Sequence, residues 1–521
     1  MLRLPSMTRA WKAADKGYDE ALASDNAARG LYQSVVETLS RMDDAEVCRR
    51  ERMQEVSLVN QGITFTVYGE DEGTERIFPF DFVPRIIGSD EWKVLEEGLI
   101  QRVTALNLFL EDVYGDQRCL REDIMPFDLV LSRSDFRREL VGTRPRHGIF
   151  THIAGIDLLR DDKGGFLVLE DNCRCPSGVS YVLENRNLLT RVFPELFANY
   201  GVRPVDRYPH MLLETLKFAA PRGRERPSVA VLTPGLNNSA YFEHSFLARE
   251  MGVPLVEGRD LIVENDQVSM RTTRGRQRVD VLYRRIDDEY IDPVVFNSKS
   301  LLGVPGLIHA WRAGNITIAN APGAGVADDK SIYPYMPDLV RFFLDEEPKL
   351  AQVHTYIGRR KDDAAYIRDH FSELVVKLTD GAGGYGMLVG PTSSKQEIAD
   401  FATKFNAHPE AYIAQPLVEF SSHPTWVGNE FASRRVDMRP FVLYGESIQV
   451  LPGGLTRVAM EEGSYVVNSS QGGGSKDTWV LAEELVPGVR CWLDQPKIST
   501  GWVDTLNVLP TCAATCLWPS N

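Results

Sequence analysis

The sequence predicts a mixed α+β and α/β protein built from several domains. Its 521 residues are enough for two to four domains with substantial hydrophobic cores. Between residues 221 and 330, apolar runs alternate with helical segments, which is typical of a parallel sheet with crossover helices. From residue 331 to 480 the pattern changes to α+β, with strand-like runs on both sides of a glycine-rich loop.

The first part of the chain is predicted to be largely helical. Residues 1 to about 60 are polar with apolar side chains at helical spacing, and residues 92–114 form a long amphipathic pattern. Two short strand-like runs, 63–68 and 77–81, separate these segments. We therefore expect residues 1–115 to be an N-terminal helical region.

The next segment predicts a β-hairpin that carries oxygen ligands. Apolar runs at 153–158 and 166–170 flank a turn with two glycines. Glu170 and Asn172 are two residues apart, so they project from the same face of a strand, and the hairpin would bring Asp157 beside them. Carboxylate and amide oxygens are suitable ligands for a hard cation such as Mg²⁺.

The segment 221–330 is predicted to form a small Rossmann-like domain. Strand-like runs at 228–235, 253–256 and 279–284 surround a helix at 241–252. Ligands of such sheets bind beyond the carboxyl ends of the strands. The residues expected near that edge are Thr233, Gly235, Asn237, Tyr283, Arg284, Arg285 and Asp287.

A lysine followed by a glycine-rich loop marks the third region. Lys377 ends a strand-like run, and residues 381–386 contain four glycines. Glycine lets backbone N–H groups approach phosphate oxygens, and the lysine adds a positive charge. The pattern fits a nucleotide lid, although a plain glycine-rich hairpin with a chance lysine would look the same.

Two further basic positions follow. Asp437 and Arg439 put an acid and a base on one strand face, and a simple surface ion pair is the alternative interpretation. Arg457 precedes the polar, glycine-rich run 468–477, which suits an anionic intermediate. A Gly/Ser linker is the alternative interpretation of that run.

Together these stretches resemble the ATP-grasp enzymes. The glutamate–amide pair of that superfamily normally follows the lysine loop, but here it precedes the loop by about two hundred residues. The chain therefore resembles a circularly permuted ATP-grasp protein (type 2), related to glutathionylspermidine synthetase. The resemblance covers roughly residues 60–480 and is carried by 170–178, 283–287, 325–330 and 470–479.

The resemblance implies a circularly permuted ATP-grasp fold with a Rossmann-like pre-ATP-grasp domain and N-terminal helices. It divides the chain into an N-terminal helical region (1–115), the permuted C-terminal part of the ATP-grasp core with the Mg²⁺ ligands (116–220), the pre-ATP-grasp domain (221–330), the lid and core (331–480) and a C-terminal tail (481–521).

The resemblance also implies the roles of individual residues. Asp157, Glu170 and Asn172 would bind Mg²⁺, and Arg439 and Arg457 would stabilise phosphoryl and carboxylate charge. The residues expected to bind ATP are Lys330, Lys377, Gly383, Gly384, Tyr385, Gly386, Gln415, Pro416 and Leu417. One departure is visible, because permuted synthetases tend to carry an arginine two residues before the first metal aspartate, where this chain has a glycine at position 155.

The implied function is an ATP- and Mg²⁺-dependent carboxylate–amine ligase that forms an amide or peptide bond through an acyl-phosphate. Its partners would be a small-molecule or peptide carboxylate and an amine acceptor. The alternatives are an ATP-dependent phosphotransferase and a non-catalytic nucleotide-binding interaction protein. Residues that could bind the acceptor, or form an ordinary ion-pair network, are Glu243, His244, Arg284, Arg285 and Asp287.

The composition of the chain argues against some classes of function. A net charge of −15 argues against nucleic-acid binding, which needs a basic face. No signal-peptide-like segment or membrane-span-length apolar run is present. Seven cysteines without framework spacing suggest reduced thiols and a cytoplasmic location. Cys173 and Cys175 are expected to be small strand-filling residues rather than metal ligands.

Overall fold

The structure, a computed structural model, describes residues 13, 17–67, 74–379, 386–428, 430–465, 467 and 472–483, with only the backbone of 64–67 and 74–77. By their contacts, residues 1–483 form one unit and residues 484–521 a second. Most of the predicted C-terminal tail therefore lies outside the described residues.

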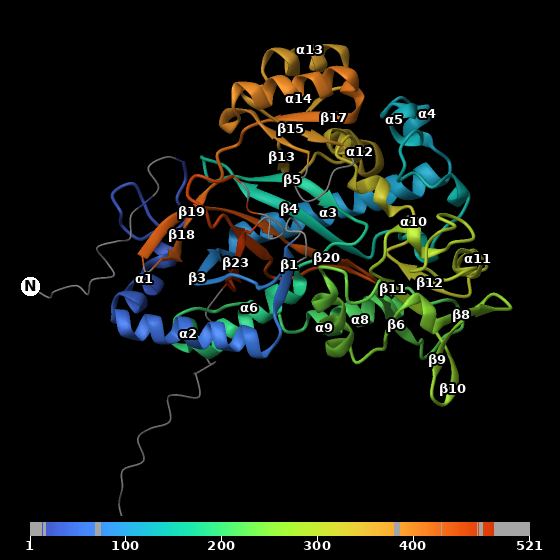
Figure 1. Cartoon of the computed structure of the whole chain (residues 1–521), viewed down its shortest axis with the longest axis horizontal. Coiled ribbons are helices and arrows are strands. Elements are labelled where there is room, and N and C mark those ends of the chain that lie inside the picture. The colour runs from blue at the N-terminus through green and yellow to red at the C-terminus, as the bar shows by residue number, and fades with distance from the viewer. Residues whose placement is uncertain are drawn as a thin grey trace, which may run out of the picture. The chain divides into compact units, whose positions relative to one another are not determined.

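A mixed ten-stranded sheet organises the first unit (Figure 1). Its main path runs β13-β5-β4-β19-β22-β23-β3, and β18, β20 and β21 extend it. The strands are β3 (Phe80–Ile87), β4 (Ile153–Arg160), β5 (Phe166–Asn172), β13 (Ala351–Gln352), β18 (Ser422–Val427), β19 (Glu430–Arg439), β20 (Phe441–Tyr444), β21 (Ile448–Val450), β22 (Leu455–Val458) and β23 (Gly474–Val480).

Strand β4 of this sheet is buried along its whole length. Along β4, Ala154, Ile156 and Leu158 belong to one hydrophobic core together with α3 (Ser89–Tyr114). Ile153 belongs to a second core, which also contains side chains of α6 (Val179–Val192). Alternate side chains of a strand point to opposite faces, so the buried β4 serves both cores.

The N-terminal region is less helical than predicted. The helices α1 (Gln33–Ser40) and α2 (Asp44–Asn60) are followed by the hairpin of β1 (Thr64–Val67) and β2 (Thr74–Ile77). Residues 17–29 instead form turns and isolated bridges. Asp19 accepts hydrogen bonds from the backbone N–H groups of Ala21 and Leu22, which compete with helix formation.

A four-stranded parallel sheet lies in the segment predicted to be Rossmann-like. Its order is β12 (Thr317–Ala319), β11 (Val281–Arg284), β6 (Val229–Leu232) and β7 (Leu255–Val256), and α8 (Tyr208–Phe218) and α9 (Tyr241–Met251) pack against it. The classification as a Rossmann-like domain stays a prediction.

The sequence analysis missed an antiparallel sheet inserted in that segment. It consists of β8 (Leu261–Glu264), β9 (Gln267–Thr272) and β10 (Gly275–Arg278). The first hairpin turns at Asn265 and Asp266, which both have positive φ angles. Asparagine and aspartate tolerate this conformation, and two such residues in succession are typical of a tight hairpin turn.

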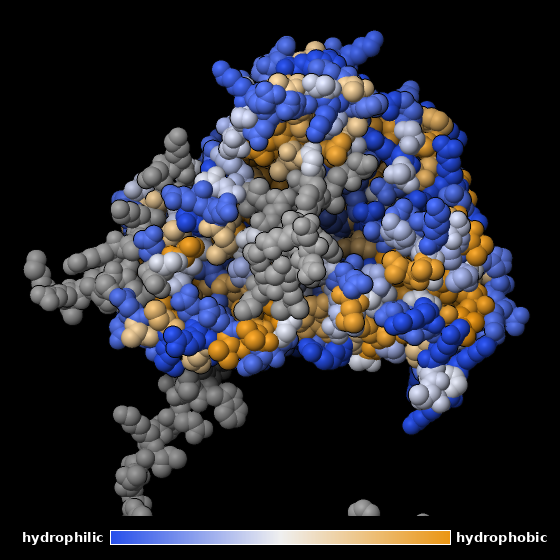
Figure 2. All heavy atoms as spheres, in the orientation of Figure 1, coloured by the Kyte–Doolittle hydropathy of each residue, from blue (hydrophilic) through white to orange (hydrophobic). Residues whose placement is uncertain are grey.

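A smaller antiparallel sheet has its own core. It contains β14 (Tyr356–Ile357), β17 (Tyr412–Pro416), β15 (Leu374–Leu378) and β16 (Leu388–Val389), with α13 (Lys361–Asp369) and α14 (Lys395–Ala407). The N-terminus of α14 has a capping box between Ser394 and Glu397. The outer surface of this layer is largely hydrophilic at the top of Figure 2.

The remaining helices connect these layers. They are α4 (Arg118–Arg121), α5 (Phe127–Leu131), α7 (Pro194–Phe197), α10 (Asp288–Ile291), α11 (Leu307–Arg312) and α12 (Met336–Leu344). Within the described ranges, no helix combines the length and apolar character that crossing a bilayer requires.

Candidate active site

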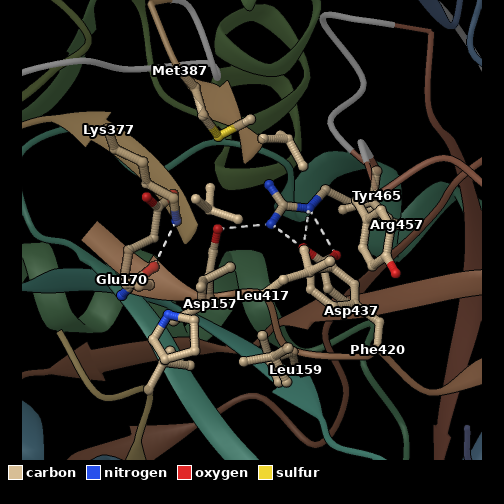
Figure 3. A pocket seen from close by; sticks show the side chains of 18 residues that line it. Asp157, Leu159, Glu170, Lys377, Met387, Leu417, Phe420, Asp437, Arg457 and Tyr465 are labelled. Carbon is tan, nitrogen blue, oxygen red and sulfur yellow. Dashed lines mark hydrogen bonds and ion pairs between the residues drawn. The ribbon is translucent and has the colours of Figure 1, made fainter. Parts of the chain in front are cut away.

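A pocket opens between the large sheet and the smaller antiparallel sheet. Strands β4, β5, β19 and β22 line one side, and β15, β16 and β17 line the other. Its charged lining residues are Asp157, Glu170, Lys377, Asp437 and Arg457. Its aliphatic and aromatic lining includes Leu159, Leu169, Val353, Val375, Met387, Val389, Leu417, Val418, Phe420, Tyr465 and Val467 (Figure 3).

The β4–β5 hairpin supplies the predicted oxygen ligands. In the antiparallel register Asp157 lies opposite Glu170, and Gly155 lies opposite Asn172. Asn172 Nδ2 donates to the carbonyl oxygen of Gly155 at 3.2 Å and lies 3.5 Å from Asp157 Oδ1. The hairpin therefore brings the three side chains together, while their role as metal ligands stays a prediction.

Two arginines bind the buried carboxylate of Asp157. Arg439 Nε lies 2.5 Å from Asp157 Oδ1, and Arg457 Nη2 lies 2.7 Å from Asp157 Oδ2 (Figure 3 shows the Arg457 contact). Burial alone would raise the pKa of Asp157, but the two guanidinium groups outweigh burial and hold this pKa well below its usual range. Asp157 is therefore an anion at neutral pH.

Asp437 completes this charged cluster. It lies opposite Arg457 in the β19–β22 register, and Arg457 Nε donates to Asp437 Oδ1 at 2.9 Å. Burial raises the pKa of Asp437 despite its partner arginine. The predicted pair of Asp437 and Arg439 is thus not a surface ion pair, because Asp437 is 1% exposed and Arg439 contacts Asp157 instead.

Two lysines approach the same site from different elements. Lys330 Nζ lies 3.3 Å from Glu170 Oε2. Lys377 Nζ donates to Gln415 Oε1 at 2.8 Å across the β15–β17 pair. The surroundings of Lys377 lower its pKa to about 8, first because burial disfavours the ammonium ion, although Glu170 acts in the opposite direction.

The predicted adenine-binding segment lies along the same pocket. Gln415, Pro416 and Leu417 all belong to the lining, and Gln415 Nε2 donates to Thr355 Oγ1 at 2.9 Å. Gly386, at the end of the glycine-rich loop, has a φ of 69° that glycine adopts without strain. Three other predicted loop residues lie outside the described residues, namely Gly383, Gly384 and Tyr385.

Several lining residues were not predicted from the sequence. Leu159 follows Asp157 by two residues on β4, so the alternation of the strand could have identified it. Tyr465 offered no such signal, because it follows the end of β22 in a loop. Its hydroxyl donates to Glu419 Oε1 at 2.5 Å, and the Arg435 guanidinium lies 3.7 Å from its ring centroid.

The donor set of the hairpin fits Mg²⁺, and Glu170 is its more accessible carboxylate. The Glu170 side chain is 28% exposed, compared with 1% for Asp157, whose oxygens already bind arginines. Mg²⁺ commonly takes one or two carboxylates and fills its coordination with water and substrate phosphates. In the described part of the chain, no three His, Cys, Asp or Glu side chains form a metal-binding group by themselves.

Three of the acceptor candidates, Glu243, Arg284 and Arg285, form buried ion pairs, whereas Asp287 is exposed and pairs with Arg174. Arg285 binds Glu243 at 3.1 Å, and Glu243 also accepts a hydrogen bond from the backbone of Gly178 at 2.7 Å. Arg284 binds Asp288 at 2.6 Å. These contacts join the parallel sheet to the start of α6, which favours the structural interpretation of the two arginines.

The glycine-rich run after Arg457 is partly a strand. The described residues Gly474 to Asp477 belong to β23, where the Lys476 side chain binds Asp81 and is 1% exposed. This part of the run is therefore neither a linker nor an anion-binding loop. Residues 468–471 lie outside the described residues.

Residues 84–459 match the family described as circularly permuted ATP-grasp type 2. The chain belongs to this family. The match includes both lysines, the predicted oxygen ligands of the hairpin and the arginines of β19 and β22. The permuted order of this family accounts for a hairpin that precedes Lys377 by about two hundred residues and lines the same pocket.

Proteins from several bacteria are similar to this chain over most of its length. An uncharacterized protein from Synechocystis is 52% identical over 89% of this chain and 97% of its own length. An uncharacterized protein from Mycobacterium tuberculosis is 50% identical over 91% and 85%. A putative glutamate–cysteine ligase from Frankia alni is 43% identical over 89% of this chain and 54% of its own.

A solved structure shares the fold at low sequence identity. A glutathione synthetase-like effector from Globodera pallida aligns over 85% of this chain and 98% of its own, with a TM-score of 0.56 and 11% identity. At this identity the match shows that the two proteins share a fold.

Proposed function

We propose that this protein is an ATP- and Mg²⁺-dependent ligase that joins a carboxylate to an amine through an acyl-phosphate. The observation that carries the proposal is the convergence of Lys377 and Arg457 on the carboxylates of Asp157 and Glu170 in one pocket, with Lys330 lying 3.3 Å from Glu170. The putative glutamate–cysteine ligases of Frankia among its relatives support an activity of this class.

The apolar part of the pocket suits the adenine of ATP, and its charged part suits the phosphates. The apolar side chains between β16 and β17 provide surfaces for the adenine ring, and backbone groups near Leu417 are available to its ring nitrogens. Lys330 and Lys377 provide positive charge for the phosphates. Mg²⁺ held by Glu170 would neutralise charge on the terminal phosphates.

The reaction needs no protein nucleophile. An oxygen of the substrate carboxylate attacks the γ-phosphorus of ATP, the bond to ADP breaks, and an acyl-phosphate forms. The amine then attacks the acyl carbon, inorganic phosphate leaves, and the amine loses a proton. Arg457 and Arg439 stabilise the negative charge that develops in both steps, because their guanidinium groups are already held in position by Asp157 and Asp437.

The test is to incubate the purified protein with ATP, Mg²⁺ and pooled metabolites, and to follow ADP and product masses. A ligase gives ADP, inorganic phosphate and a condensed product whose mass equals acid plus amine minus water. A phosphorylated acceptor without phosphate release would identify a phosphotransferase instead. Nucleotide binding without turnover would indicate a non-catalytic protein.

The variant Glu170→Gln keeps the size of the side chain and removes its charge. We expect it to lower the rate at least 100-fold and to weaken the dependence on Mg²⁺. Glu91→Gln is a suitable control, since Glu91 pairs with Arg160 outside the pocket lining. Equal rates in wild type and Glu170→Gln would refute the assignment of the metal site.

A further inference from the structure

A second cavity, of about 950 Å³, lies apart from the candidate active site. Its lining comes from the loop 141–148, from Pro221 and Arg222 after α8, and from residues 311–317 between α11 and the start of β12. It shares no lining residue with the candidate active site. Because β12 begins here, the cavity is at the amino end of that parallel strand.

The charges of this cavity are all of one sign. Arg144, Arg146, Arg222 and Arg312 line it together with His147, and its lining contains no aspartate or glutamate. We refer to it as the arginine cavity. The contrast with the whole chain is large, because the net charge of the protein is −15. Four guanidinium groups around one hollow favour an anionic occupant.

Two of the arginines already have protein partners, and two do not. Arg144 Nη2 lies 2.5 Å from Glu111 Oε1, and Arg312 Nε donates to Thr143 Oγ1 at 3.2 Å. Arg146 and Arg222 make no ion pair or side-chain hydrogen bond with any residue that the structure describes.

Arg146 gives the most direct indication of a ligand. Its Nε is buried from solvent and has no hydrogen-bond partner in the described chain. A buried donor without a partner destabilises the protein, and an anion in the cavity would remove that penalty. The positive charges of Arg146 and Arg222 also act on His147. Burial is the largest cause that lowers the pKa of His147, and the two arginines lower it further.

The loop that carries these groups is held in position. His147 has a φ of 60° and its ring stacks on Phe218 of α8 at a centroid distance of 4.2 Å. Gly142 N donates to the carbonyl oxygen of Tyr114 at the end of α3. The side chains around the cavity are thus presented by a loop with fixed contacts to two helices, as a preorganised binding site requires.

We propose that the arginine cavity binds a small phosphorylated anion with at least two adjacent phosphoryl groups. Adjacent phosphoryl groups concentrate three to four negative charges in a small volume, and guanidinium groups bind phosphate oxygens with two parallel hydrogen bonds. The volume is in the range of small-molecule sites, roughly 300 to 1,000 Å³. This site is additional to the proposed ligase activity and does not depend on it.

Pyrophosphate is the probe for the experiment, measured by isothermal titration calorimetry on the full chain without Mg²⁺. To separate the two sites, the titration is made in the Lys377→Ala protein, in which phosphate binding to the candidate active site is weakened. We expect this protein to retain a pyrophosphate site whose affinity falls steeply with salt. Adding Arg146→Gln and Arg222→Gln should weaken that site at least 10-fold.

The control for lost positive charge is Arg41→Gln with Arg49→Gln, both exposed on the N-terminal helices. This pair should leave pyrophosphate affinity unchanged. Arg222→Gln alone guards against misfolding, because Arg222 is exposed and has no partner to lose; it should weaken binding several-fold. Unchanged affinity in the Arg146→Gln, Arg222→Gln protein would overturn the site. Citrate binding as tightly as pyrophosphate would overturn its preference for phosphoryl groups.

Discussion

Arg439 reaches Asp157 by passing over Gly155. A Cβ atom at position 155 would lie 3.1 Å from Arg439 Cδ and 3.0 Å from Pro176 Cβ. The guanidinium group continues past this point and forms two contacts with the Asp157 carboxylate. Where permuted synthetases tend to carry an arginine, this chain therefore has a glycine whose missing side chain leaves room for the stem of another arginine.

This contact predicts that Gly155→Ala is destabilising. The added methyl group would push the Arg439 stem and Pro176 apart by a few tenths of an ångström, and such overpacking costs about 1 kcal/mol or more. Urea unfolding at pH 7 measures the change. Gly30→Ala is the matched control, because nothing lies within 4 Å of its added Cβ. Equal unfolding free energies for Gly155→Ala and wild type would contradict close packing of Arg439 on this position.

ATP affinity should depend on pH through Lys377. Its pKa of about 8 means that the free protein loses the ammonium charge as pH rises from 7 to 9. Because phosphate binding requires that charge, we expect the ATP dissociation constant to increase several-fold over this range. Lys377→Arg keeps its charge throughout and should flatten the profile. The same pH dependence in both proteins would show that another group is responsible.

The parts of the site that are local in sequence could be predicted, because their geometry follows from strand alternation. Asp157, Glu170 and Asn172 come together through one short turn, and period 2 decides which side chains share a face. The partners of Asp157 could not be derived in this way. Arg439 is separated from it by 282 residues, and only the order of strands in the large sheet makes them neighbours.

The run around Lys476 shows why composition can mislead. Three glycines beside serine and asparagine are typical of a loop, yet Gly474 begins a fully buried strand. Glycine fits there for a different reason, since a Cβ would lie 2.7 Å from Met460 Sδ and 3.2 Å from Val458 Cγ1. The intrinsic propensity of these residues describes only the isolated segment. In the folded protein, the sheet around β23 determines that the segment is a strand.

Acid should destabilise the protein through Glu20, which lies outside the candidate active site. Glu20 binds Arg85 in two contacts, at 2.5 Å and 2.8 Å. Burial would raise its pKa, but Arg85 and Arg160 outweigh burial and lower it to about 2. A lowered pKa contributes stability that is present above the ordinary value near 4.5 and is lost as pH falls toward 2.

The shift of Glu20 corresponds to about 3 kcal/mol at neutral pH, of which about 1 kcal/mol is lost by pH 3.5. Glu20→Gln should therefore be less stable than wild type at pH 7 and should show a smaller loss between pH 6 and 3.5. Urea unfolding across this range measures both effects. Glu37→Gln, which changes an exposed glutamate on α1, should keep the wild-type pH profile. Parallel profiles for Glu20→Gln and wild type would refute the role of this carboxylate.

Lys476 is expected to stabilise the fold and not to bind nucleotide. Its ammonium group binds Asp81 and donates to the carbonyl oxygen of Pro424 at 2.9 Å, and both charged side chains are buried. Lys476→Met leaves the Asp81 carboxylate without its cation, which should cost about 3 kcal/mol or more. Adding Asp81→Asn should recover part of that loss, because the carboxylate left without its cation is then replaced by a neutral side chain.

The ATP dissociation constant separates this structural role from a catalytic one. Lys476 does not line the candidate active site, so Lys476→Met with Asp81→Asn should bind ATP as tightly as wild type at a temperature where both are folded. Lys163→Met, in the exposed turn of the β4–β5 hairpin, is the control for the loss of a lysine and should change neither stability nor affinity. If Lys476→Met kept wild-type stability but bound ATP more weakly, Lys476 would instead have the anion-binding role that its glycine-rich surroundings suggest.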